Sequence, residues 1–231
     1  MSAEGLARED DAVRRPRRRR SAGGTGGRTP GRFGPQTAAR IVAAAQSEFG
    51  LRGYDGARIA DVAAAATIAP SAVYQYFSSK QQLYQAAYAS AQDELLVEFT
   101  TAIGSADSFA DRLRAVFAAS ARVYARSPAL VPFLASLPVE MRRHPDLVPL
   151  LAERSTEFTA VLQGMFGDAR AAGEIDAEVR ERDLTVALMG AVIGVGLMSF
   201  GLSEPRIDPA FELLTAALSG ALFGTAPPRS E

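Results

Sequence analysis

The sequence predicts an all-α protein, and three observations lead to this prediction. Apolar residues recur three or four positions apart through most of the chain after residue 36, which is the spacing of one helix face. Glycines and prolines stand mainly between these segments and divide residues 37–223 into nine expected helices. No segment alternates apolar and polar residues as a strand does, and no internal repeat is present.

Residues 1–35 are rich in Arg, Gly and Pro and contain almost no large apolar side chain, so we expect them to be disordered. They have no apolar core of the kind found in a secretory signal. Residues 1–36 carry a formal charge of +5 and the remainder −6. The run Arg14–Arg20 is therefore either a solvated tail or an arm that follows the phosphates of a nucleic acid.

Ordered structure is expected from Gln36 onwards. The first helix starts near Thr37 and ends at Gly50 to Gly53, and residues 54–56 form a turn. Its apolar face consists of Ile41, Val42, Ala45 and Phe49.

The stretch Ile59–Lys80 has the pattern of a helix-turn-helix. A short helix over residues 59–66 leads into a turn at residues 67–69, and a second helix covers residues 70–77. Pro70 is compatible with the first position of that helix, because a helix does not use the N–H there. Such crossed helices can place the second one in the major groove of DNA.

The helices that follow are longer. Ser79 and Gln82 form a capping-box pattern that starts a helix over residues 80–102. Pro145 marks the boundary between the helices expected at residues 129–143 and 146–172, because the residue before a proline avoids helical geometry. The remaining expected helices cover residues 109–126, 129–143, 146–172, 180–201 and 208–223.

The segment Leu184–Ser203 contains twenty residues without a charge, which is long enough to cross a membrane. Four of the twenty are glycines, and no belt of aromatic or basic residues flanks the run. We therefore favour a helix buried on all sides within a protein over a membrane span.

Composition argues against an enzyme. The chain has no cysteine and only one histidine, His144. It contains no phosphate-binding loop and no pair of carboxylates at catalytic spacing. We expect no catalytic residue, no cofactor and no metal site.

The helix-turn-helix and its flanks resemble the N-terminal domain of the TetR family of bacterial transcriptional regulators, of the TetR/AcrR type. The resemblance covers residues 37–87. The residues that carry it are Phe49, Gly53-Tyr54, Ile59 to Ala63, Val73-Tyr74, Tyr76-Phe77 and Ser79-Lys80.

This resemblance implies an N-terminal three-helix DNA-binding domain and a C-terminal domain of roughly six helices for effector binding and dimerisation. The corresponding boundaries are a basic arm at 1–35, the helix-turn-helix domain at 36–80, the effector and dimerisation domain at 81–224 and a frayed tail at 225–231. The last two helices would form a four-helix bundle with a second copy. Gly190 and Gly194 would allow close approach there, which favours a dimer seam over a membrane span. A two-fold homodimer suits a palindromic operator.

The resemblance also implies which residues contact DNA: Arg58, Ser71, Ala72, Tyr74, Gln75, Tyr76 and Lys80. Ser71 and Gln75 can bond base edges, and Tyr74 matches a family position that contacts phosphate or base. For three of these residues, a role other than a DNA contact remains open. Tyr76 can instead pack against the first helix of the motif, Lys80 can be a solvated lysine, and Arg58 can be a free surface charge. Arg40 is a weaker candidate for a DNA contact.

Two residues of the turn depart from the family pattern. Thr67 stands where the family usually has glycine, and a β-branched residue at positive φ costs on the order of 1 kcal/mol. Ala69 stands where the family usually has Ser or Thr as a helix cap, and losing that cap costs about 1 kcal/mol.

The effector side gives weaker signals. Apolar residues at helical spacing could line a cavity for a small apolar effector, or could simply form the core. They are Phe117, Tyr124, Phe133, Leu137, Met141, Phe158, Leu162, Met189 and Met198. His144 is either a polar group that senses the ligand or an exposed junction residue.

Together these features predict a cytoplasmic homodimer that binds double-stranded DNA and represses transcription until a small molecule releases it. Two alternatives remain open at this point. One is a dimeric small-molecule-binding protein whose DNA binding is weakened by the changes at Thr67 and Ala69. The other is a transcriptional activator of the same fold.

Overall fold

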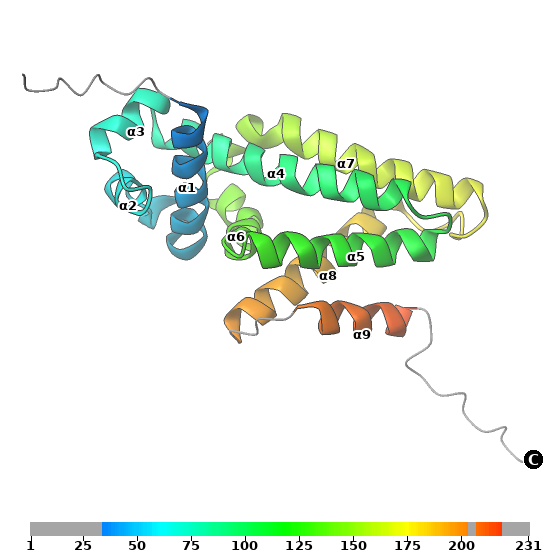
Figure 1. The fold of residues 1–231 in the computed structure, drawn as a ribbon. Coiled ribbons are helices and arrows are strands. Elements are labelled where there is room, and N and C mark those ends of the chain that lie inside the picture. The colour runs from blue at the N-terminus through cyan, green and yellow to red at the C-terminus, as the bar shows by residue number, and fades with distance from the viewer. Residues whose placement is uncertain (1–33, 203–206, 219–231) are drawn as a thin grey trace, which may run out of the picture. The chain divides into compact units, whose positions relative to one another are not determined.

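A computed structural model describes residues 34–202 and 207–218. Within these residues the chain forms nine α-helices and one 3₁₀ turn and contains no strand, which confirms the predicted all-α class (Figure 1). The elements are α1 Pro35–Gly56, α2 Ile59–Ala65, α3 Pro70–Tyr76, α4 Lys80–Gly104, α5 Phe109–Arg126, α6 Leu130–Arg143, η1 Pro145–Leu147, α7 Val148–Ala171, α8 Glu181–Gly201 and α9 Asp208–Leu218. The predicted basic arm, the C-terminal tail and the expected end of the last helix lie outside the described residues.

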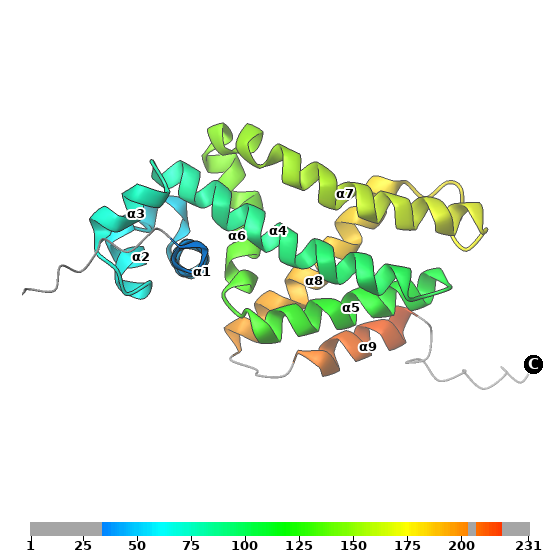
Figure 2. The same ribbon diagram turned by 45° about the horizontal axis from the view of Figure 1, so that its top comes forward.

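Helices α4, α5 and α7 run side by side and form the long part of the fold (Figures 1 and 2). Helices α1 to α3 lie together at the end of α4 where that helix begins. Helix α6 packs against α1 on one side and α8 on the other, and α9 packs against α5. The helix-turn-helix is thereby joined to the rest of the fold through α1 and the start of α4.

Helix α1 contains one break, at Gly53. This residue has φ 70° and ψ 176°, a conformation that glycine adopts far more readily than other residues. Residues 54–56, expected as a turn, form one more helical turn beyond the break. A Cβ atom at Gly53 would lie 2.7 Å from Oε1 of Glu140, so the position also has no room for a side chain.

Helices α1 and α6 approach closely at Gly50. A Cβ atom there would lie 2.8 Å from the main-chain nitrogen of Phe133, and a main-chain atom cannot move aside as a flexible side chain can. Aromatic rings surround this contact: Phe49 and Tyr84 meet edge to face at 4.9 Å, and Tyr84 and Phe133 at 5.5 Å. The bare backbone of Gly50 therefore fixes how α1 sits on α6.

Replacing Gly50 by alanine should destabilise the protein by about 1–3 kcal/mol, because the added methyl group overfills a closely packed contact. Gly167→Ala is the matched control, since nothing lies within 4 Å of its Cβ position. In the interior of α7, that change should stabilise the protein by about 0.5–1 kcal/mol. Urea denaturation of both variants measures the two effects, and equal stability of the two would contradict the contact.

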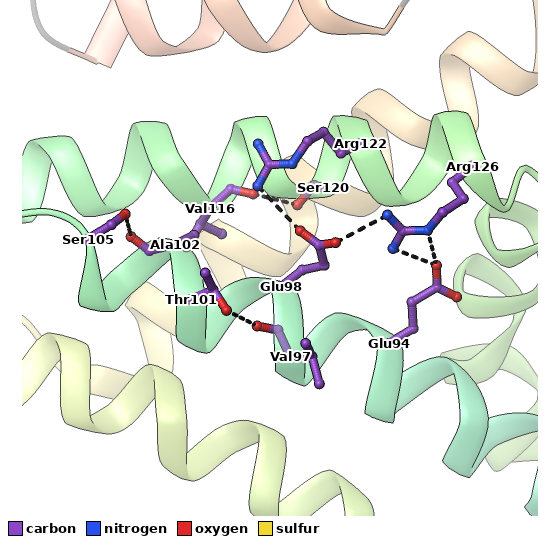
Figure 3. Close-up of polar contacts among 10 residues, drawn as sticks. All are labelled: Glu94, Val97, Glu98, Thr101, Ala102, Ser105, Val116, Ser120, Arg122 and Arg126. Carbon is purple, nitrogen blue, oxygen red and sulfur yellow. Dashed lines mark hydrogen bonds and ion pairs between the residues drawn. The ribbon is translucent and has the colours of Figure 1, made fainter.

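A ladder of ion pairs joins α4 to α5 (Figure 3). Arg126 donates two hydrogen bonds to Oε1 of Glu94, at 2.9 and 3.0 Å, and one to Glu98 at 3.1 Å. Arg122 donates to the other oxygen of Glu98 at 3.3 Å. The hydrogen bonds to Glu94 and Glu98 raise the pKa of the Arg126 guanidinium. These contacts hold the C-terminal half of α5 in register with α4.

Helix α8 differs from its prediction. The expectation that it is buried on all sides is wrong for a single chain, because α6 and α7 cover only one face of it. Val186, Leu197, Met198 and Phe200 remain exposed. Among the described residues, α8 is also the one helix long and apolar enough to cross a membrane, judged by length and composition.

Candidate nucleic-acid interface

The turn between α2 and α3 is built on Thr67, which has φ 58° and is the one residue other than glycine with positive φ in the described ranges. The N–H of Thr67 donates to the carbonyl of Ala64, and the N–H of Ile68 donates to the carbonyl of Ala63, both at 3.0 Å. This pair of bonds is a Schellman motif, which usually has glycine at the position of Thr67. The turn therefore keeps helix-turn-helix geometry, although threonine is unfavourable at this positive φ.

Replacing Thr67 by glycine should stabilise the protein by about 0.5–1 kcal/mol, because the left-handed conformation costs an L-residue roughly 1–2 kcal/mol. Thr67 is exposed, so the change removes little packing. Ala64→Gly, at an exposed position in α2, should destabilise the protein by about 1 kcal/mol. Thermal denaturation distinguishes the two, and destabilisation by both would show that Thr67 is not strained.

The start of α3 lacks a side-chain cap, as expected from Ala69. Ala69 has extended geometry and makes no capping bond through its side chain, and Pro70 follows at the first helical position. Proline has no N–H to satisfy there and has its φ already fixed, which offsets part of the missing cap. On the inner face Val73 is fully buried and anchors this seven-residue helix.

The outer face of α3 carries three of the predicted DNA contacts. Ser71, Tyr74 and Gln75 are exposed, and the Tyr74 side chain is among the largest exposed apolar groups, at 55%. Ala72 and Tyr76 are only partly exposed. Tyr76 packs against the hydrophobic core, with its ring 6.4 Å from that of Phe77.

Lys80 lies at the first position of α4 and is partly exposed. Its ammonium group donates to the main-chain carbonyl of Asp55 at 3.1 Å and lies 4.9 Å from the centre of the Tyr54 ring. Partial burial lowers the pKa of Lys80, while the charges of Asp55 and Glu140 oppose that shift. The residue is held next to α3 by the end of α1.

Only one of the two hydrogen bonds of the predicted capping box before α4 is formed. The Ser79 hydroxyl accepts the N–H of Gln82 at 3.1 Å, as expected. The side-chain oxygen of Gln82 accepts the N–H of Ser78 at 2.6 Å, rather than that of Ser79. The short loop between α3 and α4 is thus bonded on both sides of the helix start, which fixes the direction of α4 relative to α3.

The two arginines proposed from sequence have different surroundings. Arg58 is exposed and immediately precedes α2, where its carbonyl accepts the N–H groups of Asp61 and Val62. The guanidinium of Arg40 donates to the carbonyl of Ala66 at the end of α2. Arg40 therefore ties α1 to the C-terminus of α2, a structural role that spacing alone could not reveal.

The aromatic and aliphatic residues predicted for an effector pocket do not come together in one cavity. Phe117 borders a cavity, whereas Met141 borders a shallow groove near α7. Met189 packs against the core, and five of the other predicted residues are buried within it: Tyr124, Phe133, Leu137, Phe158 and Leu162. For these residues the structure supports the alternative of a packed core. Met198 is exposed on α8.

The cavity that Phe117 borders has a volume of about 510 Å³ and lies among α5, α7, α8 and α9. Its walls come from Phe109, Ala110, Leu113, Arg114, Phe117, Phe166, Leu184, Ala187, Leu188, Ala191, Leu214 and Thr215. Arg114 is the one charged group among them, and it is paired with Asp111. The walls include three alanines, which give no signal in a search for large apolar side chains.

Residues 41–87, which span α1 to the first part of α4, match the family model described as bacterial regulatory proteins, tetR family. The matched segment contains the helix-turn-helix and both of its flanks.

The chain therefore carries a DNA-binding domain of the TetR family.

A relative of this TetR-family chain is the HTH-type transcriptional regulator UidR of Escherichia coli K12. The two are 23% identical over 159 residues, which are 69% of this chain and 79% of UidR. The TetR-family chain is therefore a transcriptional regulator with a DNA-binding domain.

Solved structures with the same fold include the fatty acid degradation regulator FadR from Bacillus halodurans, with a TM-score of 0.66 and 16% identity. A second is FadR from Bacillus subtilis in complex with stearoyl-CoA, with a TM-score of 0.65 and 16% identity. Each comparison covers 81% of this chain and 99% of the other. At these identities the similarity establishes the fold of this TetR-family protein, including its C-terminal helices.

Proposed function

We propose that this protein is a cytoplasmic, dimeric repressor that binds a palindromic operator through α3 and leaves it when a small apolar molecule binds. The proposal rests on the exposed face of α3, where Ser71, Tyr74 and Gln75 project from a helix-turn-helix whose turn is closed by main-chain hydrogen bonds. A polar and aromatic surface on a rigidly held helix is what a major-groove reader needs.

Each side chain on this face has chemistry suited to DNA. The Gln75 amide can form two hydrogen bonds with an adenine edge, and the Ser71 hydroxyl can bond any base. Tyr74 can contact a phosphate or the methyl group of thymine, while Ala72 allows the helix to approach closely. Arg58 and Lys80, together with Tyr76 at the edge, contact the phosphates that flank the groove.

The cavity among α5, α7, α8 and α9 is the proposed effector site. Its volume of about 510 Å³ is within the range of small-molecule sites. The pairing of Arg114 with Asp111 leaves no unpaired charge for an ionic ligand to meet, which favours a neutral, apolar effector. The stearoyl chain of the stearoyl-CoA bound to Bacillus subtilis FadR is likewise apolar.

Release would follow from the way α4 is packed. Two walls of the cavity, α5 and α7, contact α4, and α4 begins at Lys80 directly after α3. A ligand that favours a different spacing of α5 and α7 would therefore favour a different position of α4 and α3. The two recognition helices of a dimer would then no longer match major grooves about 34–36 Å apart.

The exposed faces of α8 and α9 are the proposed dimer seam. Together they line a groove of about 610 Å³ that includes Gly194, Met198, Leu202 and Leu213. Nothing lies within 4 Å of the Cβ positions of Gly190 and Gly194, so a second copy can approach the α8 backbone there. Apolar surface of this kind on paired helices is suited to a four-helix bundle.

Replacing Met198 by glutamate should produce folded monomers, because it places a charge in this apolar groove. Met198 is 63% exposed in a single chain, so the stability of the protomer should change by less than about 0.5 kcal/mol. Operator affinity should fall at least about tenfold, since one half-site no longer supports the other. Val97→Glu, at an exposed position on α4, is the control and should remain dimeric by analytical ultracentrifugation.

Electrophoretic shift with the DNA upstream of the protein's own gene tests the function as a whole. We expect a complex at low salt that weakens as salt is raised, because phosphate contacts dominate the affinity. Addition of a suitable apolar ligand should release the DNA. No complex at low salt, with or without candidate ligands, would disprove the proposed function.

A further inference from the structure

His144, the chain's one histidine, lies where α6 meets the end of α1. Its main-chain N–H caps α6 by donating to the carbonyl of Glu140 at 2.8 Å. The side chain is only 18% exposed, so the expectation of an exposed junction histidine is wrong: the Tyr54 ring covers it at 4.9 Å between ring centres. This residue thus joins the helix-turn-helix part of the chain to α6.

Two carboxylates face the same nitrogen of His144. Its Nε2 atom is 3.3 Å from Oδ2 of Asp55 and 3.6 Å from Oε2 of Glu140, and it makes no hydrogen bond of good geometry to either. Glu140 is a buried carboxylate with a 6% exposed side chain, whereas the Asp55 side chain is 82% exposed. An imidazolium ring at this place would be attracted to both carboxylates, and a neutral ring would not.

The remaining charges around His144 come from the elements packed against it. Lys80 of α4 and Arg143 of α6 are positive, and Nη1 of Arg143 is 3.9 Å from Oε1 of Glu140. Asp146 of η1 is negative and accepts a hydrogen bond from the side-chain amide of Gln81 at 2.9 Å. Burial raises the pKa of Tyr54, and the charge of Asp146 raises it further. With Asp55 and Glu140 there are three acidic groups against two basic ones.

The same turn that faces His144 also holds Lys80. Asp55 contributes its side chain to the histidine and its main-chain carbonyl to the Lys80 ammonium, and Tyr54 contacts both residues through its ring. Movement of residues 54 and 55 would therefore move the partner of Lys80. No contact links Lys80 to His144 directly, so any influence passes through this turn.

We propose that His144 is a positioning residue for Lys80: when protonated, it holds Asp55 and Glu140 together and thereby fixes the turn that aims Lys80 at a DNA phosphate. This inference rests on the proposed role of Lys80 in DNA binding. It assigns DNA binding a pH dependence near neutrality that a purely structural histidine would not produce.

The sign of the effect follows from the two carboxylates. Imidazole changes charge between pH 5 and pH 8, whereas Asp, Glu, Lys and Arg side chains ordinarily do not. The attraction requires a positively charged ring, which acidic conditions favour. DNA affinity should therefore fall as the pH increases, by about three- to tenfold beyond any general effect, the amount expected for two partly exposed ion pairs.

Fluorescence anisotropy on one operator fragment at pH 6.0 and pH 8.0 tests this inference in the full-length protein. The variants are His144→Gln, which cannot become charged, and Asp55→Asn, which removes the exposed carboxylate but keeps the carbonyl that binds Lys80. Both should bind DNA with nearly the same affinity at the two pH values, whereas the wild-type protein should bind more tightly at pH 6.0.

The outcomes separate this inference from the proposed function. An equal pH dependence in the wild-type protein and His144→Gln would overturn the role of His144 while leaving operator binding intact. Loss of the pH dependence in His144→Gln but not in Asp55→Asn would contradict the path through Asp55. Absence of DNA binding by the wild-type protein at both pH values would contradict the proposed function and the inference with it.

Discussion

Replacing Tyr74 by alanine should reduce operator affinity by about ten- to a hundredfold, which corresponds to the loss of a contact worth roughly 1–3 kcal/mol. Tyr74 is exposed on the outer face of α3, so its removal should change the stability of the fold by less than about 0.5 kcal/mol. Dimerisation and ligand binding should remain unchanged. Fluorescence anisotropy with a labelled operator measures the affinity, and analytical ultracentrifugation measures the dimer.

Leu51→Ala is the matched control for Tyr74→Ala. Leu51 is also a large exposed apolar side chain, but it belongs to α1. Its removal should leave operator affinity within about twofold of wild type. Equal losses from the two variants would mean that α3 is not the surface that meets DNA.

Replacing Ala191 by tryptophan should abolish the response to effector while preserving DNA binding. Ala191 belongs to α8 and borders the cavity of about 510 Å³, so an indole at this position would occupy space that the ligand needs. We expect ligand affinity to fall about a hundredfold or more, because the competing side chain cannot be displaced without leaving apolar surface in water. The result would be a repressor that an inducing ligand no longer releases.

Binding of the uncharged fluorescent dye Nile red provides a readout before the natural effector is known. Ala160→Trp is the control, since Ala160 borders the separate shallow groove near α7. This variant should bind the dye as the wild-type protein does. Loss of dye binding in Ala160→Trp, with no loss in Ala191→Trp, would place the ligand site in the other groove.

Much of the fold could be predicted because its determinants are local. Helical spacing and the positions of Pro and Gly located the nine helices, and the helix after Ser79 starts at Lys80 as expected. The unfavourable turn was also predictable, because Thr67 occupies a position that the family pattern reserves for glycine, and its φ is indeed positive. These features depend on a few neighbouring residues.

The site was less predictable because its geometry depends on residues far apart in the sequence. Lys80 lies against Tyr54 and Asp55, and Arg40 bonds to Ala66, only after α1, α2 and α4 have packed together. The cavity likewise takes its shape from four helices and is partly lined by alanine. Of the large apolar residues expected to line a cavity, Phe117 borders this one, while most of the others are buried in the core.

The exposed face of α8 shows a related limit. An uncharged run such as Leu184–Ser203 has the same composition whether it lies in a core, in a membrane or between two protein copies. In a single chain α5, α6 and α7 pack on one side of it and leave much of its other side exposed. This is why the proposed seam on α8 and α9 is tested by changing Met198, which lines the exposed groove.

Sequencing the genomic DNA fragments that the purified protein selects is the most direct test of operator binding through α3. We expect one inverted repeat to be enriched, with half-sites about one helical turn apart or a multiple of that distance, and we expect Tyr74→Ala to lose the enrichment. Recovery of no common sequence at low salt, or equal enrichment by Tyr74→Ala, would contradict it.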